Sequence, residues 1–66
     1  MKLRVNGDEH DLPDETDLLA VLLQLGFPRD AVAVAVDGVV IPRRIHAGHR
    51  LREGQSVEVI RAVGGG

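Results

Sequence analysis

Short segments of the 66-residue chain alternate polar and apolar side chains with the period of two that is typical of β-strands. The first segment, residues 2–5, is followed by Asn6 and Gly7, a pair typical of two-residue hairpin turns because both residues tolerate positive φ. We expect the chain to return as a second strand over residues 9–12. Pro13 has no N–H to donate and therefore ends the pairing.

A helix is predicted next, because apolar residues recur on one face of a helical turn. The stripe consists of Leu18, Val21, Leu22 and Leu25. Thr16 is the predicted N-cap, and the acidic residues beside it lie where the positive end of the helix dipole favours them. Gly26 suits a left-handed C-terminal cap, so the predicted helix is about nine residues long.

A third strand is predicted over residues 31–36, where alanine and valine alternate. This period puts the three valines on one face, which we expect to lie in the core, and the three alanines on the other. Asp37 and Gly38 then predict a second tight turn.

Two more strands complete the pattern. Residues 39–41 form a short strand that Pro42 ends. Residues 45–52 show no clear period, and Gly54 lies in a turn that leads to a last strand over residues 56–61.

The predicted core consists of the positions that satisfy the strand and helix periods together. They are Leu3, Val5, Leu18, Val21, Leu22, Leu25, Val34, Val36, Val57 and Val59. Two strands, a helix and three strands indicate an α+β domain, with one main helix packed on one face of a mixed sheet. This is a β-grasp arrangement, and in that fold the first and last strands lie side by side and parallel. We expect residues 1–61 to form the domain and residues 62–66 a flexible C-terminal tail that ends in Gly-Gly.

The amino-acid composition argues against several classes of protein. A chain of 66 residues has room for one domain, and without cysteine it must be stabilised by aliphatic packing rather than by disulfides. One Phe and no Trp or Tyr leave almost nothing to stack on bases, so nucleic acid is not an expected partner. The apolar runs are too short to cross a membrane and no signal-peptide pattern is present, so we expect a cytoplasmic protein.

Charge is distributed unevenly. Residues 1–37 carry eight acidic and three basic side chains, a net charge of -5, whereas residues 38–66 carry five arginines and two glutamates, a net charge of +3. Two interpretations remain: a solvated surface of mixed charge, or a basic strip that steers an acidic partner.

The chain lacks the usual residues of a catalytic or metal site. There is no cysteine, and Ser56 follows a turn with no histidine near it in the sequence. His46 and His49 are spaced as a helical pair, but together with His10 they are better interpreted as surface histidines than as metal ligands. We therefore expect neither an enzyme nor a bound metal.

The three glycines at residues 64–66 are the most informative feature. They are typical either of a frayed terminus or of a tail that passes through a channel too narrow for side chains. Residues 62–66 can reach roughly 15 to 18 Å beyond the last strand. In the second case the tail presents its carboxylate to a reagent held in another protein. Adenylation by ATP would activate the carboxylate, and a sulfur donor would then convert it to a thiocarboxylate.

Three segments resemble the ThiS family of thiamine-pathway sulfur carriers. They are AVAVAVDGVVIPR over residues 31–43, LREGQSVEV over residues 51–59 and VIRAVGGG over residues 59–66. The resemblance extends over essentially the whole chain. Its most specific parts are the Ile41-Pro42-Arg43 segment, the turn at Gly54 and the final Gly65-Gly66.

This resemblance implies a ubiquitin-like β-grasp fold and a protein cosubstrate rather than an enzyme. Gly66 would be adenylated by a ThiF-type adenylyltransferase, which consumes the ATP, so that the carrier itself binds no cofactor. A sulfur donor protein would form the thiocarboxylate, and a ThiG-type thiazole synthase would receive the sulfur. Gly64 and Gly65 would give clearance in the channel.

Partner docking is expected on the sheet face opposite the helix. Ile60 points away from the predicted core because it alternates with Val57 and Val59. Arg43, from the family-like segment, and Val63, from the tail, are the other predicted docking residues.

Two alternatives remain open. The first is a MoaD-like molybdopterin sulfur carrier, which shares the fold and the terminal glycines. The second is a non-catalytic β-grasp interaction module similar to TGS domains. A module of that kind tolerates a blocked C-terminus, whereas a sulfur carrier does not.

Overall fold

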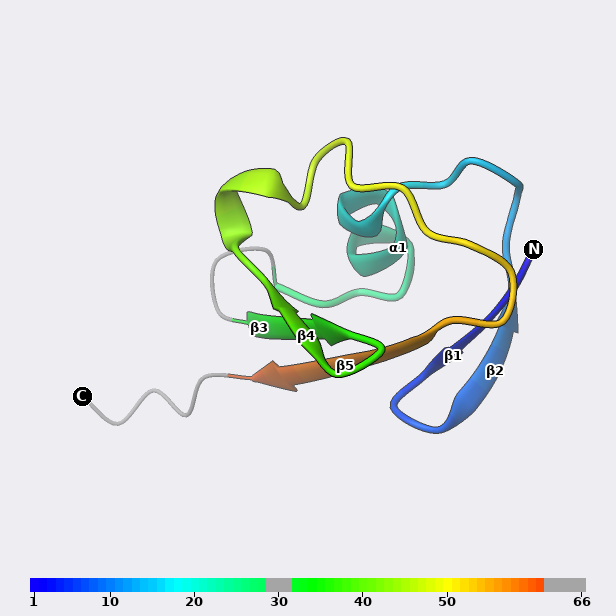
Figure 1. The fold of residues 1–66 in the computed structure, drawn as a ribbon, viewed down its shortest axis with the longest axis horizontal. Coiled ribbons are helices and arrows are strands. Elements are labelled where there is room, and N and C mark those ends of the chain that lie inside the picture. The colour runs from blue at the N-terminus through cyan, green and yellow to red at the C-terminus, as the bar shows by residue number, and fades with distance from the viewer. Residues whose placement is uncertain (29–31, 62–66) are drawn as a thin grey trace.

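The computed structural model describes residues 1–28 and 32–61 (Figure 1). Its elements are β1 (Lys2–Val5), β2 (Asp8–Asp11), α1 (Leu18–Gln24), β3 (Val32–Val36), β4 (Val39–Ile41), the 3-10 helix η1 (Arg43–Ile45) and β5 (Ser56–Arg61). The strands form a sheet of order β2-β1-β5-β3-β4. β1 and β5 are parallel, and the other neighbours are antiparallel. The predicted element order, the mixed sheet and the parallel pairing of the first and last strands are confirmed.

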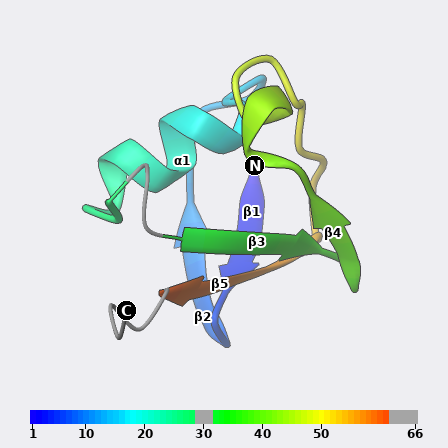
Figure 2. The same cartoon turned by 90° about the vertical axis from the view of Figure 1, so that its left-hand side faces the viewer.

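The helix covers one face of the sheet, as Figures 1 and 2 show from two directions. Both predicted hairpin turns are present, with φ of 50° and 87° at Asn6 and Gly7 and of 49° and 83° at Asp37 and Gly38. Positive φ at both central residues matches the right-handed twist of the flanking strands. α1 has only seven residues, far fewer than a bilayer requires, and the described residues contain no helix that could cross a membrane.

The helix begins one residue later than predicted. Asp17, not Thr16, is the N-cap, and its Oδ1 accepts a hydrogen bond of 2.8 Å from the N–H of Ala20. The Thr16 hydroxyl instead donates to the carbonyl of Pro13 at 2.6 Å. The second carboxylate oxygen of Asp17 accepts from the N–H of Gly48 at 2.9 Å, so this residue also anchors a distant loop. The two hydrogen bonds lower the pKa of Asp17 below its ordinary value of 3.8.

The C-terminal cap at Gly26 is confirmed. Gly26 has a φ of +80°, and its N–H donates to the carbonyl of Leu23, while the N–H of Phe27 donates to the carbonyl of Leu22. These are the two hydrogen bonds of a Schellman cap. Leu25 is the C-cap residue, so the helix is shorter than predicted.

The core lies between α1 and the inner face of the sheet. Nine of the ten predicted core residues are buried, and the tenth, Leu25, is half-buried because it lies at the cap. Val32 is buried with the other two valines of β3, as their shared face predicted. Leu12, Ile41 and Leu51 are also buried, although Leu12 and Leu51 lie outside the strands.

His46 is buried, and the prediction of a surface histidine is wrong. Its side chain is 2% exposed, and Nε2 lies 2.9 Å from the carbonyl oxygen of Ile41. The segment that carries it lies against the N-terminus of α1, where the carbonyls of His46 and His49 accept from the N–H groups of Leu19 and Leu18. These carbonyls satisfy the free N–H donors of the first helical turn. Because the loop packs against the helix, the imidazole of His46 is buried.

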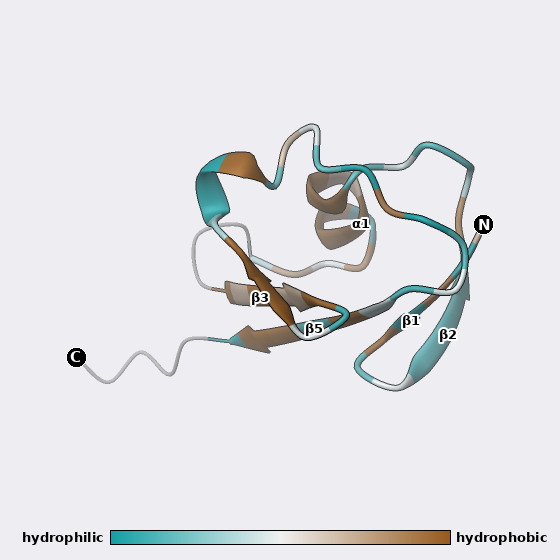
Figure 3. Cartoon of the chain, in the orientation of Figure 1, coloured by the Kyte–Doolittle hydropathy of each residue, from teal (hydrophilic) through white to brown (hydrophobic). Residues whose placement is uncertain are grey.

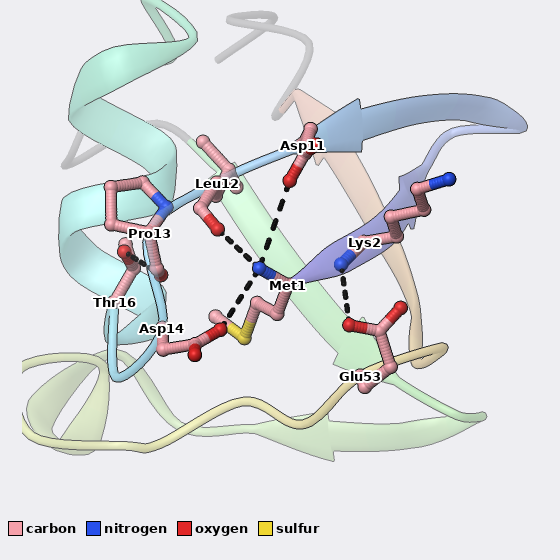
Figure 4. Close-up of polar contacts among 8 residues, drawn as sticks. All are labelled: Met1, Lys2, Asp11, Leu12, Pro13, Asp14, Thr16 and Glu53. Carbon is pink, nitrogen blue, oxygen red and sulfur yellow. Dashed lines mark hydrogen bonds and ion pairs between the residues drawn. The ribbon is translucent and has the colours of Figure 1, made fainter.

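The α-ammonium of Met1 is held by acidic groups between β2 and the helix (Figure 4). It donates to the carbonyl of Leu12 and to Oδ1 of Asp14 at 3.0 Å, and lies 3.7 Å from Oδ1 of Asp11. The hydrogen bond to Asp14 is the largest influence on this group and raises the pKa of the ammonium above its ordinary value of 8.0. Folding therefore favours the protonated amine.

This contact predicts that the 66-residue polypeptide loses stability as the pH rises above about 8. Because the folded-state pKa is the higher one, the stabilisation is complete below the unfolded-state value and is lost as the pH passes the folded-state value. Urea unfolding between pH 6 and 10 measures the effect, and the chain has no Cys or Tyr whose titration would overlap it. Asp14→Asn should weaken the dependence, whereas Asp8→Asn, at the far end of the hairpin, should leave it unchanged. Equal slopes in all three proteins would contradict the assignment to Asp14.

Candidate functional site

Most of the residues predicted for the site lie in the tail. Val63, Gly64, Gly65 and Gly66 are outside the described residues, so their predicted roles rest on the sequence. The described part of the site is the carboxyl end of β5, which leads directly into residue 62.

Asn6 fixes the strand that leads into the tail. Its side-chain Nδ2 donates to the carbonyl of Val59 at 3.2 Å, and its Oδ1 accepts from the N–H of Val59 at 2.8 Å. Its own N–H donates to the carbonyl of Val57 at 2.9 Å. The amide therefore extends the parallel pairing of β1 and β5 beyond the end of β1. The sequence pattern predicts Asn6 only as a turn residue, because nothing local signals a contact with a strand more than 50 residues away.

The outer face of the sheet carries a small apolar surface next to the tail. Ile60 is 63% exposed and lies opposite Ala33 on β3. Ala35 lies two residues further along β3, opposite Val40 of β4, which is also exposed. Figure 3 shows this half of the sheet in hydrophobic colours, whereas β2 is hydrophilic. We call Ile60, Ala33, Ala35 and Val40 the outer apolar face. The outward orientation predicted for Ile60 is confirmed.

Two arginines lie at or just beyond the ends of β4 and β5, the two strands that flank β3. Arg43 is exposed and begins η1, immediately after the proline that ends β4. Arg61 is the last residue of β5, and its guanidinium carbon lies 5.9 Å from the centre of the Phe27 ring. This distance is within the range of a cation–π contact, which orients the charge at the base of the tail.

The described residues offer little for catalysis. Among residues 1–28 and 32–61, no three His, Asp or Glu side chains come together in a way that could hold a metal ion. A surface hollow lies over β1 and the start of β5, lined by Lys2, Arg4, Glu9, Glu53 and Ser56 among others. It lies towards the start of β5, whereas the tail follows the end of that strand.

The sequence of this chain matches a family model. The model of the ThiS family aligns with residues 3–66, nearly the whole chain and including the three final glycines. The chain belongs to the ThiS family. The resemblance inferred from the residue segments is thereby confirmed.

A solved member of the ThiS family has the same fold. The crystal structure of the thiamine biosynthesis protein ThiS from Geobacter metallireducens superimposes with a TM-score of 0.85 over 100% of both chains, at 26% sequence identity. The predicted β-grasp fold, with its mixed sheet and single helix, is therefore confirmed.

Longer proteins also contain a segment similar to this ThiS-family chain. The chain is 35% identical over its 66 residues to a thiazole synthase from Magnetococcus marinus and 30% identical to one from Paramagnetospirillum magneticum. In each comparison all of the chain is matched, but it spans only 20% of the length of the relative.

Proposed function

We propose that this chain is a sulfur carrier of thiamine biosynthesis, in which the α-carboxylate of Gly66 is the group that carries sulfur. The observation that supports this most strongly is the match to the ThiS family, which runs through the glycines. The proposal requires the carboxylate of Gly66 to be free. The chain then acts as a cosubstrate of other enzymes and binds no cofactor of its own.

The chemistry follows from the weakness of a carboxylate as an electrophile. One carboxylate oxygen of Gly66 attacks the α-phosphorus of ATP, and pyrophosphate leaves. A sulfur nucleophile then attacks the carbonyl carbon of the acyl-adenylate, and AMP leaves with the bridging oxygen. Gly64 and Gly65 have no Cβ, so the tail can approach the nucleotide through a narrow channel.

Three partners follow from this scheme. A ThiF-type adenylyltransferase supplies ATP and the activation step, a sulfur donor protein supplies the sulfur, and a ThiG-type thiazole synthase consumes the thiocarboxylate. The similarity to segments of two thiazole synthases supports the last of these. In those relatives a carrier-like segment and a synthase share one polypeptide, an arrangement expected of two proteins that work together.

Thiol alkylation combined with intact-mass analysis tests the proposed function. The chain is incubated with ATP, a ThiF-type adenylyltransferase and sulfide, and then with iodoacetamide. Because the chain has no cysteine, one added carbamidomethyl group reports the thiocarboxylate. The alkylation step is needed because oxidation of Met1 changes the mass by nearly the same amount as replacing oxygen with sulfur. A chain that stays unlabelled with an active adenylyltransferase would contradict the proposal.

We expect Ile60→Glu to weaken adenylation while leaving the fold intact. Ile60 is exposed beside the base of the tail, so a partner that takes up the tail must cover it. Burying a carboxylate there without a partner charge is unfavourable. The second-order rate constant of adenylation should fall about tenfold or more, equivalent to ~1.4 kcal/mol of binding free energy.

Leu23→Glu is the matched control. Leu23 is 58% exposed, close to the value for Ile60, but it lies on α1 and therefore on the opposite side of the sheet. The Leu23→Glu substitution introduces the same carboxylate in place of an apolar side chain similar to that of Ile60. If both variants were adenylated at the wild-type rate, Ile60 would not belong to the docking surface.

A further inference from the structure

Three arginines lie in or directly after strands that run towards the end of the domain from which the tail leaves. β4 runs antiparallel to β3, from the Val36 end towards the Val34 end, and η1 follows it with Arg43 and Arg44. β5 runs in the same direction along β3 and ends with Arg61 opposite Val32. Figure 1 shows η1 and the end of β5 on the left of the molecule, with η1 at the level of α1 and the end of β5 below it. We call Arg43, Arg44 and Arg61 the tail-end arginines.

Their charges are not balanced by the described part of the chain. All three side chains are exposed, and no carboxylate of residues 1–28 and 32–61 forms an ion pair with any of them. Arg50, in contrast, lies 3.6 Å from Glu15. Three acidic residues of β2 belong to the first hairpin, on the opposite edge of the sheet from β4. This end of the domain therefore carries positive charges that form no ion pair with a carboxylate of the described residues.

We propose that the tail-end arginines dock against an acidic protein surface that surrounds the entrance of the site receiving the tail. This rests on the proposed function and adds the chemistry of the partner's surface to it. The partner's surface then meets Ile60 on the outer face of the sheet and the three arginines around the end of the domain, including Arg61, whose guanidinium lies over Phe27. Rim charges of this kind steer encounter and accelerate association.

Protein carboxylates fit this surface better than phosphates do. The nucleotide must meet the carboxylate of Gly66, and an extended tail places that group up to about 17 Å beyond Arg61. Arginines at the base of the tail then stay at the entrance, away from the phosphates. Nucleic acid is disfavoured because the whole chain has a net charge of -2 and a single aromatic residue.

The experiment measures the association of the carrier with a ThiF-type adenylyltransferase by stopped flow at low and high NaCl concentration. The test variant is Arg43→Glu/Arg44→Glu, because both side chains are exposed and make no polar contact with other described residues. The matched control is Arg50→Glu/Arg52→Glu, which makes the same change in net charge. Arg52 precedes β5 and so lies at the end away from the tail. Circular dichroism confirms that each variant is folded.

We expect the test variant to associate at least about tenfold more slowly at low salt, and the difference to shrink at high salt as charges are screened. The control should stay within about twofold of wild type. Arg43→Lys/Arg44→Lys keeps the charge and should associate at close to the wild-type rate. Turnover at saturating carrier should be unchanged in all variants, because the arginines do not touch the reacting atoms.

Several results would overturn this inference while leaving the proposed function intact. Wild-type association by the glutamate variant would do so, as would an equal loss in the control or in the lysine variant. In each case the wild-type chain still forms the thiocarboxylate. A wild-type chain that is never adenylated would instead remove the proposed function and this inference together.

Discussion

Leu22→Ala should remove most of the stability of the domain. Leu22 is completely buried in α1, where it packs into the hydrophobic cluster formed by the helix and the sheet. A large-to-small change at such a site costs about 2–5 kcal/mol, because contacts are lost and a cavity remains. A chain of this length has only about 3–10 kcal/mol in total, at roughly 0.05–0.15 kcal/mol per residue. The variant should therefore be largely unfolded or close to it.

The measurement is urea unfolding followed by far-UV circular dichroism, since the chain has no Trp or Tyr to report by fluorescence. Leu23→Ala is the control, because it makes the same substitution at the next position of the same helix, where the side chain is 58% exposed. Its stability should stay within about 0.5 kcal/mol of wild type. Equal losses in the two variants would show that helix propensity rather than burial determines the result.

The parts of the fold that sequence analysis predicted correctly depend on local signals. The alternation of β3 and β5 determined which side chains face the core, including the outward position of Ile60. Asn6-Gly7, Asp37-Gly38 and Gly26 adopt positive φ, which few other residues do readily. The parallel pairing of β1 and β5 is not local, and it was predicted only through the fold.

The errors arise where distant segments meet. Thr16 and Asp17 are both suitable N-caps, and Asp17 is the one that also binds the N–H of Gly48, a contact over 31 residues. His46 was predicted to be exposed because residues 45–52 have no period, yet this segment caps α1 and its imidazole is buried. Leu51 was missed for the same reason.

The candidate site was predicted only in part. The three glycines were identified from the sequence because a run of residues without side chains is chemically distinctive. The role of Asn6, which fixes β5 next to the tail, had no such signature. The division between domain and tail at residue 61 stays a prediction, since residues 62–66 are outside the described part.

Appending one alanine after Gly66 should abolish sulfur transfer. The added residue moves the carboxylate by roughly 3.5 Å and places a methyl group inside a channel that accepts glycine. A misplacement of about 1 Å at a reacting centre can already cost about 100-fold in rate. Formation of the thiocarboxylate, measured by alkylation and intact mass, should therefore fall by at least about 100-fold.

Two further variants separate the effect of displacing the carboxylate from the effect of the added methyl group. One glycine appended after Gly66 moves the carboxylate by the same length without a methyl group, and Gly66→Ala adds the methyl group without the displacement. Both should be strongly impaired if position and clearance each matter. The unfolding free energy should not change in any of the three, because Val59 is the last buried side chain of the described residues.

The outcome that decides against the carrier is full activity of the alanine-extended protein, shown by mass spectrometry to be uncleaved. A carboxylate three to four ångströms out of place cannot react at an unchanged rate in a site built for Gly66. The reaction would then not depend on a site built for Gly66, and docking through the outer apolar face would be the specific property of this chain. That result would favour the interaction module, since docking through the sheet does not depend on the identity of the last residue.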